Sequence, residues 1–281
     1  MQTNVLIAIA NIVNTKIINV VENNVSTNRA NNMGESLEIY IKDIFCNSLT
    51  IDDPKKDFNK YRKYFSFEGS QNTPPDLIIR NGDAIEVKKI ENIRSSISLN
   101  SSYPKDKLHS DSTLISNACR ECEKWDVKDL LYCIGIVNGR KLKCLWFVYG
   151  DCYAADKSVY ERIKNTITSG VENIPDVIFS ETNEIARINN VDPLKITYFR
   201  IRGMWGIENP INVFDVPPLN KNAAFTLYAI MKEKKYLSFP DKDRKRLEDI
   251  KDSNFMIKDI NIKSPNNPMK FIKGKIIKYE I

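Results

Sequence analysis

Two long apolar runs, separated by a short Asn-Gly segment, dominate the middle of the chain. They extend over residues 130–137 and 142–149 in the sequence DLLYCIGIVNGRKLKCLWFVYGD. Runs that are apolar at nearly every position predict strands buried on both faces, and Asn-Gly is typical of a hairpin turn. Along the chain, the predicted elements follow the order helix, strand pair, helix, strand pair, helix and strand. This order indicates an α/β protein with a mixed central β-sheet flanked by helices.

A second hairpin, predicted over residues 74–89 (PPDLIIRNGDAIEVKK), carries charged residues among its apolar ones. Side chains alternate between the two faces of a strand, and residues directly opposite each other point to the same face. A two-residue Asn-Gly loop would put Asp76 opposite the apolar Val87. A three-residue loop or a bulge instead pairs Leu77 with Val87 and Ile79 with Ile85, so we expect that register.

In the expected register Asp76 lies opposite Lys88 and diagonal to Glu86, which gathers two carboxylates and an amine on one face. Two carboxylates suit a hard cation such as Mg²⁺. The ammonium group can position or activate water and offset charge that develops on phosphorus. The pattern therefore predicts phosphodiester hydrolysis, although a solvated hairpin face has a similar pattern.

Further elements follow from apolar periodicity. An amphipathic helix is predicted where Leu37, Ile41, Ile44 and Phe45 recur at helical spacing, after a polar loop over residues 24–33. We expect other helices over residues 4–22, 111–124, 154–170 and 223–234, and strands over residues 196–201 and 270–279. The basic residues Lys242, Arg244, Lys245 and Arg246 are expected on a solvated helix face.

Composition limits the class of protein. The 281 residues fit one large domain or two small ones, and 42% hydrophobic with 28% charged residues is typical of a globular protein. The 42 basic residues exceed the 36 acidic ones, for a formal net charge of +6. This charge is compatible with a polyanionic partner but does not require one.

The N-terminal segment MQTNVLIAIANIVNTKIINVVENN is apolar in part, but polar residues interrupt it, and it lacks a basic start and a small-residue cleavage site. We expect no membrane span or signal peptide and a cytoplasmic, reducing location with free thiols. A zinc ion at Cys119 and Cys122 would need a second ligand pair, which Cys133, Cys144 and the lone His109 do not provide at a suitable spacing.

The triplet of Asp76, Glu86 and Lys88 resembles the motif of the PD-(D/E)xK nuclease superfamily. The blocks IEVKKIE, LNSSYPKDKLHSDS, FVYGD and VDPLKITYFRIRGMWGIENP resemble type II restriction endonucleases of the NgoPII kind, over about residues 34–214. The resemblance implies a homodimeric, Mg²⁺-dependent endonuclease of double-stranded DNA with the palindromic target GGCC and 5′-phosphate products. It also implies one restriction-endonuclease domain over residues 1–281, with a catalytic core at about 34–150 and DNA-reading and C-terminal elements at about 151–281. A cognate DNA methyltransferase is expected in the same system, though not necessarily in contact.

The resemblance also implies residue roles. Asp76, Glu86 and Lys88 are the catalytic residues, and Asp76, Glu86 and the main chain of Val87 hold the metal. A glutamate of the first core helix often joins such sites, and Glu35 is the first candidate here, with Glu38 second. Either one can equally be an exposed glutamate that the helix dipole favours.

DNA contacts are expected in two segments. Residues 98–112 follow the catalytic strand and are rich in hydroxyls and amides, while residues 200–202 place two arginines on one strand face, where arginine can read guanine or pair with structural carboxylates. The DNA-binding candidates are Asn100, Ser101, Ser102, Tyr103, Lys105, Lys107, Arg200 and Arg202. Trp205 is expected in the core or an interface rather than as a stacking residue.

Two other functions stay open on the sequence. The chain can be a DNA-binding protein whose hairpin charges are only surface, or a PD-(D/E)xK nuclease that acts on damaged or branched DNA. A GIY-YIG nuclease is disfavoured because LLYCIGIVNG lacks the second tyrosine motif. A ββα-metal nuclease is disfavoured because the chain has a single histidine.

Overall fold

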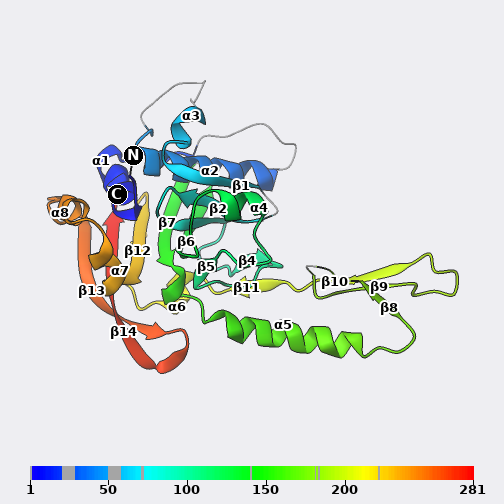
Figure 1. The fold of residues 1–281 in the computed structure, drawn as a ribbon. Helices are drawn as coiled ribbons and strands as arrows, with labels where there is room; N and C mark the ends of the chain where they lie inside the picture. Colours follow the sequence, from blue (N-terminus) through cyan, green and yellow to red (C-terminus); the bar gives the residue numbers. More distant parts are fainter. Residues whose placement is uncertain are drawn as a thin grey trace.

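A mixed sheet forms the centre of the protein (Figure 1). The computed structural model describes residues 2–20, 29–49, 58–70, 73–139, 141–180, 182, 184–220 and 222–281. Within these residues the main sheet has the order β1-β2-β3-β6-β7-β12-β14-β13, and β5 pairs with β6 off this path. The strands are β1 (Phe65–Ser70), β2 (Thr73–Ile79), β3 (Ala84–Ile90), β5 (Lys107–His109), β6 (Val127–Asn138), β7 (Lys141–Tyr149), β12 (Thr226–Lys232), β13 (Phe255–Ser264) and β14 (Asn267–Glu280). The pairs β3–β6 and β7–β12 are parallel and the others antiparallel, so the predicted mixed sheet is confirmed.

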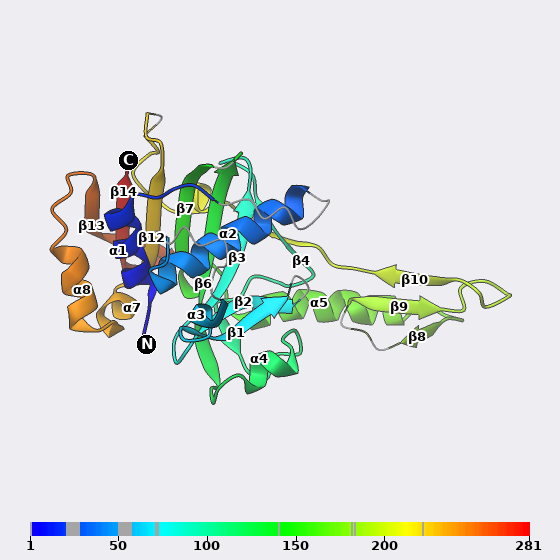
Figure 2. The same ribbon diagram turned by 90° about the horizontal axis from the view of Figure 1, so that it is seen from above.

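Helices flank this sheet, as the fold class predicts. The helices are α1 (Val5–Thr15), α2 (Arg29–Cys46), α3 (Phe58–Tyr61), α4 (Asn117–Glu121), α5 (Lys157–Glu172), α6 (Pro210–Val213), α7 (Glu233–Ser238) and α8 (Asp241–Glu248), with a 3-10 turn at Gly150–Cys152. Figure 2 shows α2 lying across the sheet, with α1, α7 and α8 at one end. None of the helices in the described ranges is long and apolar enough to cross a membrane.

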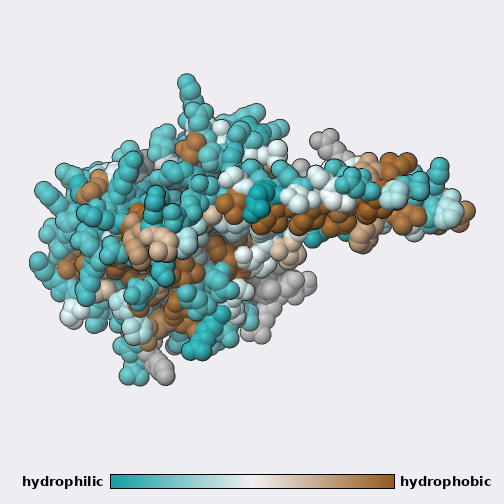
Figure 3. All heavy atoms as spheres, turned by 90° about the horizontal axis from the view of Figure 1, so that it is seen from below, coloured by the Kyte–Doolittle hydropathy of each residue, from teal (hydrophilic) through white to brown (hydrophobic). Residues whose placement is uncertain are grey.

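A narrow arm projects from the body. It consists of α5 and a three-stranded antiparallel sheet of β8 (Ile178–Ser180), β9 (Ala186–Asn189) and β10 (Tyr198–Ile201). Figure 1 shows the arm extending well beyond the central sheet, and Figure 3 shows it projecting from the body of the molecule. The chain returns to the body through β11 (Trp205–Ile207). This strand pairs with β4 (Ile97–Asn100), which follows β3 in the sequence.

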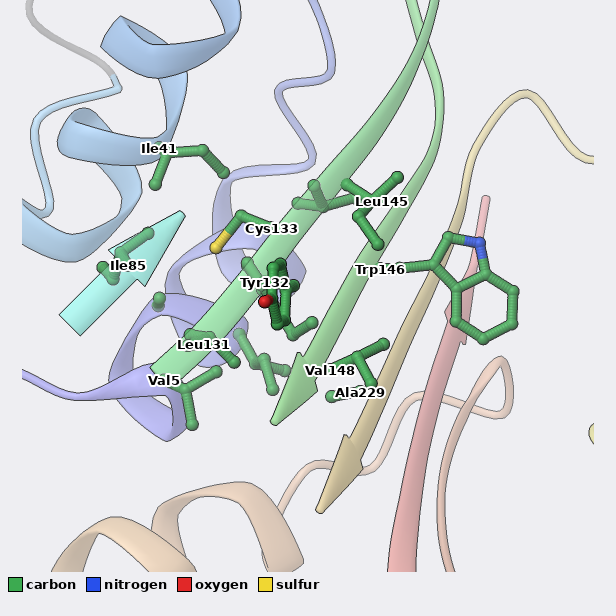
Figure 4. Close-up of a cluster of buried hydrophobic side chains, with 14 of the residues drawn as sticks. Val5, Ile41, Ile85, Leu131, Tyr132, Cys133, Leu145, Trp146, Val148 and Ala229 are labelled. Atoms are coloured by element: carbon green, nitrogen blue, oxygen red, sulfur yellow. The ribbon is translucent and has the colours of Figure 1, made fainter. Parts of the chain in front are cut away.

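The core lies between α2 and the central strands (Figure 4). The four apolar residues that predicted the amphipathic helix are all buried in α2: Leu37, Ile41, Ile44 and Phe45. The ring of Phe45 contacts the edge of Phe147 on β7 with centroids 6.4 Å apart. Nearly all of the two apolar runs of β6 and β7 is buried, which confirms that this hairpin is central.

One element was predicted wrongly. Residues 223–234 were expected to be a helix, but residues 226–232 form β12, which lies between β7 and β14. Six of its seven residues are buried, because both faces of the sheet are covered there. A short run that is apolar on both sides has no helical or alternating period, so its pattern does not separate a buried strand from a helix.

Other predictions are correct in kind but not in extent. The helix expected over residues 4–22 ends at Thr15, where Lys16 adopts a left-handed conformation (φ 55°). The loop expected over residues 24–33 contains the start of α2 at Arg29, and residues 24–28 lie outside the described residues. The helix over 111–124 shortens to α4, the helix expected to end at Gly170 continues to Glu172, and the strand over 196–201 begins at Tyr198. A helix over the basic residues 242–246 and a strand over 270–279 are confirmed.

The hairpin that carries Asp76 and Glu86 has a register two residues away from the predicted one. Leu77 pairs with Ile85, not with Val87, and Ile78 pairs with Ala84. The loop has three residues, as expected, but it spans 80–82, because the Ile79 N–H donates to the Asp83 carbonyl and the Gly82 N–H to the Ile79 carbonyl. A shift of two positions leaves every side chain on the face where it was predicted, since side chains alternate with period two.

Gly150, at the end of β7, allows a close approach of the segment that follows β4. A Cβ atom at this position would lie 2.6 Å from the carbonyl oxygen of Asp106 and still closer to that of Lys105. Both neighbours are main-chain atoms, which cannot rotate away as a side chain can. The glycine of the FVYGD block therefore sets how closely the segment of Lys105 lies against the sheet.

We expect Gly150→Ala to lower the free energy of unfolding by about 1–3 kcal/mol, since extra atoms in a tightly packed site force the backbone to shift. Gly34→Ala is the matched control: Gly34 is in α2, and no atom lies within 4 Å of the place that its added methyl group would occupy. This control should gain about 0.5–1 kcal/mol from helix propensity. Urea unfolding followed by circular dichroism measures both, and equal stability of the two variants would contradict the close approach.

Candidate active site

Asp76 and Glu86 are brought together where β2 and β3 diverge. The two strands pair only at Leu77–Ile85 and Ile78–Ala84. Beyond this point no main-chain hydrogen bond joins the two strands at Val87. The Oδ2 atom of Asp76 accepts the hydrogen bond of the Val87 N–H instead, at 2.6 Å. The bond holds the Asp76 carboxylate beside the residues on either side of Val87.

Lys88 completes the cluster. Glu86 and Lys88 point to the same face of β3, and the Lys88 Nζ lies 2.6 Å from the Glu86 Oε1. Burial alone lowers the pKa of Lys88, but the charges of Glu86 and Asp76 and the hydrogen bond to Glu86 outweigh it and raise that pKa above its ordinary value. Lys88 is therefore protonated at neutral pH.

The surroundings of Asp76 disfavour the charged form of its carboxyl group. Burial and the neighbouring Glu86 charge raise the pKa of Asp76 to about 7, although Lys88 and the Val87 N–H lower it. Two carboxylates and one ammonium in a half-buried site leave negative charge without compensation. A divalent cation would supply the missing positive charge, so the two carboxylates fit a hard metal ion.

Lys105 lies close enough to this cluster for the charges of Glu86 and Lys88 to act on it. Tyr132 stands opposite Glu86 on β6, and its hydroxyl accepts from the Lys105 N–H at 2.8 Å and donates to the Lys105 carbonyl at 3.2 Å. The Lys105 side chain is buried and donates to the Ser102 hydroxyl. Burial lowers the pKa of Lys105 to about 8, with a further lowering by Lys88 and a partial rise from Glu86.

The helix glutamates occupy α2, which packs on the face of the sheet opposite to Glu86. Glu38 contributes to the raised pKa of Asp76, so its charge reaches the cluster. The Lys42 Nζ forms salt bridges with Glu38 Oε1 and Glu68 Oε2, each at 2.9 Å. The structure therefore supports Glu38, the second candidate, more directly than Glu35, whose place in the site stays a prediction.

The other predicted DNA-binding residues of the segment after β3 have different surroundings. The segment is not a plain loop, since it contains β4 and β5. Asn100 and Ser101 are exposed, and Lys107 is paired with Asp129 at 2.9 Å. Tyr103 is part of an aromatic cluster: its ring stacks on Tyr160 of α5 at 5.5 Å and contacts the edge of Trp205 at 6.3 Å.

Arg200 and Arg202 lie on the arm, apart from the catalytic strands (Figure 1). Both guanidinium groups bind the carboxylate of Glu184, at 2.5 Å in each case. Their side chains are 45% and 58% exposed, so they stay accessible although they are paired. In the free protein both arginines pair with a structural carboxylate, which was one of the two expected roles. Contacts of either arginine with a DNA base stay a prediction.

A cleft of about 410 Å³ adjoins the cluster at Lys105. It lies between residues 103–114 and α5, and four of its lining residues are the lysines Lys105, Lys107, Lys157 and Lys164. All six cysteines are free thiols, and among the described residues no group of three or more His, Cys, Asp and Glu side chains is arranged to hold a metal.

Two comparisons with known proteins found matches that span most of the chain. The family model described as NgoPII restriction endonuclease matches residues 3–263. The type II restriction enzyme NgoPII of Neisseria gonorrhoeae is 45% identical over 280 residues, which cover 99% of this chain and all of the relative. No solved structure matches the chain.

The raised pKa of Asp76 predicts how pH and metal affect stability. The raised pKa means that the folded state binds the Asp76 proton more tightly than the unfolded state does. Protonation of Asp76 therefore stabilises the folded protein fully below about pH 4, and this stabilisation is lost as the pH rises through about 7. Without metal, Asp76→Asn should therefore unfold at a higher temperature than the unmodified protein at pH 8. Mg²⁺ or Ca²⁺ should raise the Tm of the unmodified protein at pH 8 but leave that of Asp76→Asn nearly unchanged.

Differential scanning calorimetry with and without EDTA measures these shifts. Glu91→Gln, at an exposed carboxylate just beyond β3, serves as the control and should keep the response to metal. A cation that fails to raise the Tm of the unmodified protein at pH 8 would contradict the fit of the cluster to a metal.

Proposed function

Because the chain belongs to the NgoPII restriction endonuclease family, a family of site-specific endonucleases, we propose that it cleaves double-stranded DNA at the palindrome GGCC. The reaction is Mg²⁺-dependent hydrolysis of one phosphodiester bond per strand, and it leaves 5′-phosphates. The observation that supports this most directly is the Asp76 carboxylate held by the Val87 N–H beside the Glu86–Lys88 pair.

In this proposal Asp76, Glu86 and the main chain of Val87 hold the metal. An ion bound there would supply positive charge beside the phosphate and would lower the pKa of a water molecule that it holds. Lys88 is kept protonated by Glu86 and Asp76, so it acts as a fixed cation that orients the attacking water and offsets charge on the phosphorus oxygens, and not as a general base. Glu38 is the helix glutamate that tunes the charge of Asp76.

Lys105 is proposed to contact a phosphate next to the scissile bond. Its ammonium group is buried, has a hydroxyl partner in Ser102 and stacks over the Tyr103 ring at 5.6 Å. A buried ammonium is costly unless an anion compensates it, and a phosphate oxygen is such an anion. The DNA backbone would then continue along the cleft past Lys107, Lys157 and Lys164.

Base reading is assigned to Arg200 and Arg202, together with the exposed Asn100 and Ser101. Each arginine would exchange Glu184 for a guanine edge, which offers two acceptors to a guanidinium group. A palindromic target matches a homodimer with a two-fold axis. A cognate methyltransferase of the same system protects the host's own sites.

We expect Asp76→Ala and Lys88→Ala each to lower cleavage by a factor of about 10³ or more while Ca²⁺-supported binding of GGCC duplexes is largely kept. The control is Lys89→Ala, the next residue of β3, which pairs with the exposed Glu91 on the other face. Plasmid cleavage with Mg²⁺ gives the rates, and sequencing of the fragment ends gives the target and the cut position. Full cleavage by either site variant would contradict the assignment, and binding without any cutting would favour a DNA-binding protein.

The low pKa of Lys105 predicts a loss of activity on the alkaline side. The ammonium loses its proton as the pH rises through about 8, so a phosphate contact weakens above that pH. Lys105→Arg should extend cleavage to higher pH because arginine stays charged, and Lys105→Gln should lower kcat about 10- to 100-fold. Lys107→Gln, at a half-buried lysine nearby, should change the salt dependence of binding more than the pH profile. Identical pH profiles for the arginine variant and the unmodified protein would contradict the role of Lys105.

A further inference from the structure

The three-stranded sheet of the arm has one covered face and one open face. Ala186 and Ile188 of β9 are only 4% and 6% exposed, and they face α5, which contacts β9. Figures 1 and 2 show α5 running along this side of the arm. Because side chains alternate along a strand, Arg187 and Asn189 point to the opposite face, where Arg187 is exposed.

The strand register places two arginines side by side on this open face. Arg187 of β9 is directly opposite Arg200 of β10, and on its other side it is opposite Ser180 of β8. Residues directly opposite each other point to the same face, with Cα atoms about 4.5–5.5 Å apart. Like charges in such a pair destabilise a sheet. A ligand with acceptors for both guanidinium groups would remove this cost.

The guanidinium group of Arg187 is oriented by its neighbours on the open face. Its Nε donates to the Asn189 Oδ1 at 3.2 Å, and the group lies over the Tyr198 ring at 4.5 Å from the centroid. Asn189 in turn donates to the Ser180 hydroxyl. Both partners of the guanidinium group are neutral, so they restrain it without cancelling its charge.

Arg200 and Arg202 share one carboxylate, that of Glu184. Arg200 donates to both oxygens of Glu184, and Arg202 pairs with the same group. The Glu184 side chain is only 13% exposed, so leaving it unpaired would be costly. Since Arg202 can keep it neutralised, Arg200 is free to exchange Glu184 for another acceptor.

The arginine pair lies near the root of the arm, the end that joins the body. Glu184, which binds Arg200, lines a groove of about 220 Å³ together with Ser101 and Trp205. Trp205 pairs with Asn100 at the end of β4, and β4 follows β3 in the sequence. The open face therefore adjoins the exposed Asn100 and Ser101, on the segment that leads to the cleft.

We propose that the open face of the arm sheet lies in the major groove of DNA, where Arg187 and Arg200 read the two successive guanines of one half-site. Each guanine offers its O6 and N7 atoms to the planar fork of one guanidinium group. Arg187 is then a specificity-determining residue, and Tyr198 is a positioning residue that acts through it. The inference rests on the proposed function and refines it, because Arg187 takes the place of Arg202 as the second reader of guanine.

The dimensions of the sheet and of the target agree with this arrangement. Strands lie about 4.8 Å apart, so a three-stranded sheet fits a major groove about 12 Å wide. Long side chains that begin about 5 Å apart can converge on guanines stacked about 3.4 Å apart. In each half of GGCC the two guanines are adjacent on one strand, as the two arginines are adjacent across one strand pair.

Binding of a short duplex with one central GGCC tests the inference, with Ca²⁺ in place of Mg²⁺ and fluorescence anisotropy as the readout. Arg187→Ala should weaken binding of this duplex about 10- to 100-fold and leave binding of a duplex without the site nearly unchanged. Arg162→Ala is the matched control, because it removes an exposed arginine from α5, behind the sheet. It should weaken both duplexes by the same small factor.

A modified base locates the contact. In 7-deazaguanine a C–H group replaces N7, which removes one of the two acceptors. At one guanine of the half-site this change should weaken binding by the unmodified protein but not further weaken binding by Arg187→Ala. At the other guanine it should have no further effect on Arg200→Ala.

Tyr198 gives a readout of positioning. Tyr198→Phe keeps an aromatic ring under the guanidinium group and should keep the preference for GGCC. Tyr198→Ala should lose part of that preference while the salt dependence of binding stays the same, since no charge is removed.

An equal loss of affinity for both duplexes in Arg187→Ala, or full additivity of the Arg187→Ala and 7-deazaguanine effects at both guanines, would overturn the inference. Cleavage at GGCC by the unmodified protein would then still support the proposed function. Arginine-dependent binding of GGCC without any cutting in Mg²⁺ would overturn the proposed cleavage alone. An unmodified protein without preference for GGCC would overturn both.

Discussion

The hydrogen bond from the Val87 N–H to the Asp76 carboxylate is the contact on which the candidate site depends. It forms because β2 leaves β3 after two pairs of residues, so that a side-chain oxygen takes the place of a main-chain acceptor. The bond fixes one carboxylate beside the strand whose alternation presents Glu86 and Lys88 on a single face. Without the divergence of the strands, Asp76 would be one more residue of a paired ladder.

Holding two carboxylates together costs free energy, and the surrounding sheet supplies the rigidity that makes the arrangement possible. β3 is paired with β6 over its whole length, and α2 packs on the opposite face through buried side chains such as Leu37 and Ile41. The pKa of Asp76 is raised first by its burial and then by the neighbouring Glu86 charge. A site of this kind is least favourable when it is charged and empty of cations, which is also the state in which its affinity for a divalent ion is greatest.

The sequence predicted the fold class, both hairpins, α2, the family and the grouping of Asp76, Glu86 and Lys88 on one face. The grouping is correct although the predicted register was wrong by two residues. Side chains alternate with period two, so a shift by an even number of residues leaves each of them on the same face. β12 was mistaken for a helix because its apolar run has no period. The position of Lys105 could not be predicted, since it depends on a long-range contact with the Tyr132 hydroxyl and on the space left by Gly150.

A cluster of three aromatic rings links the arm to the segment that lies beside Glu86. Tyr103 stacks on Tyr160 of α5, and Trp205 packs against both rings. Two residues after Tyr103, the main chain of Lys105 is bound by Tyr132, which stands opposite Glu86. A contact that fixes the direction of α5 therefore also restrains the segment beside the Asp76 and Glu86 carboxylates.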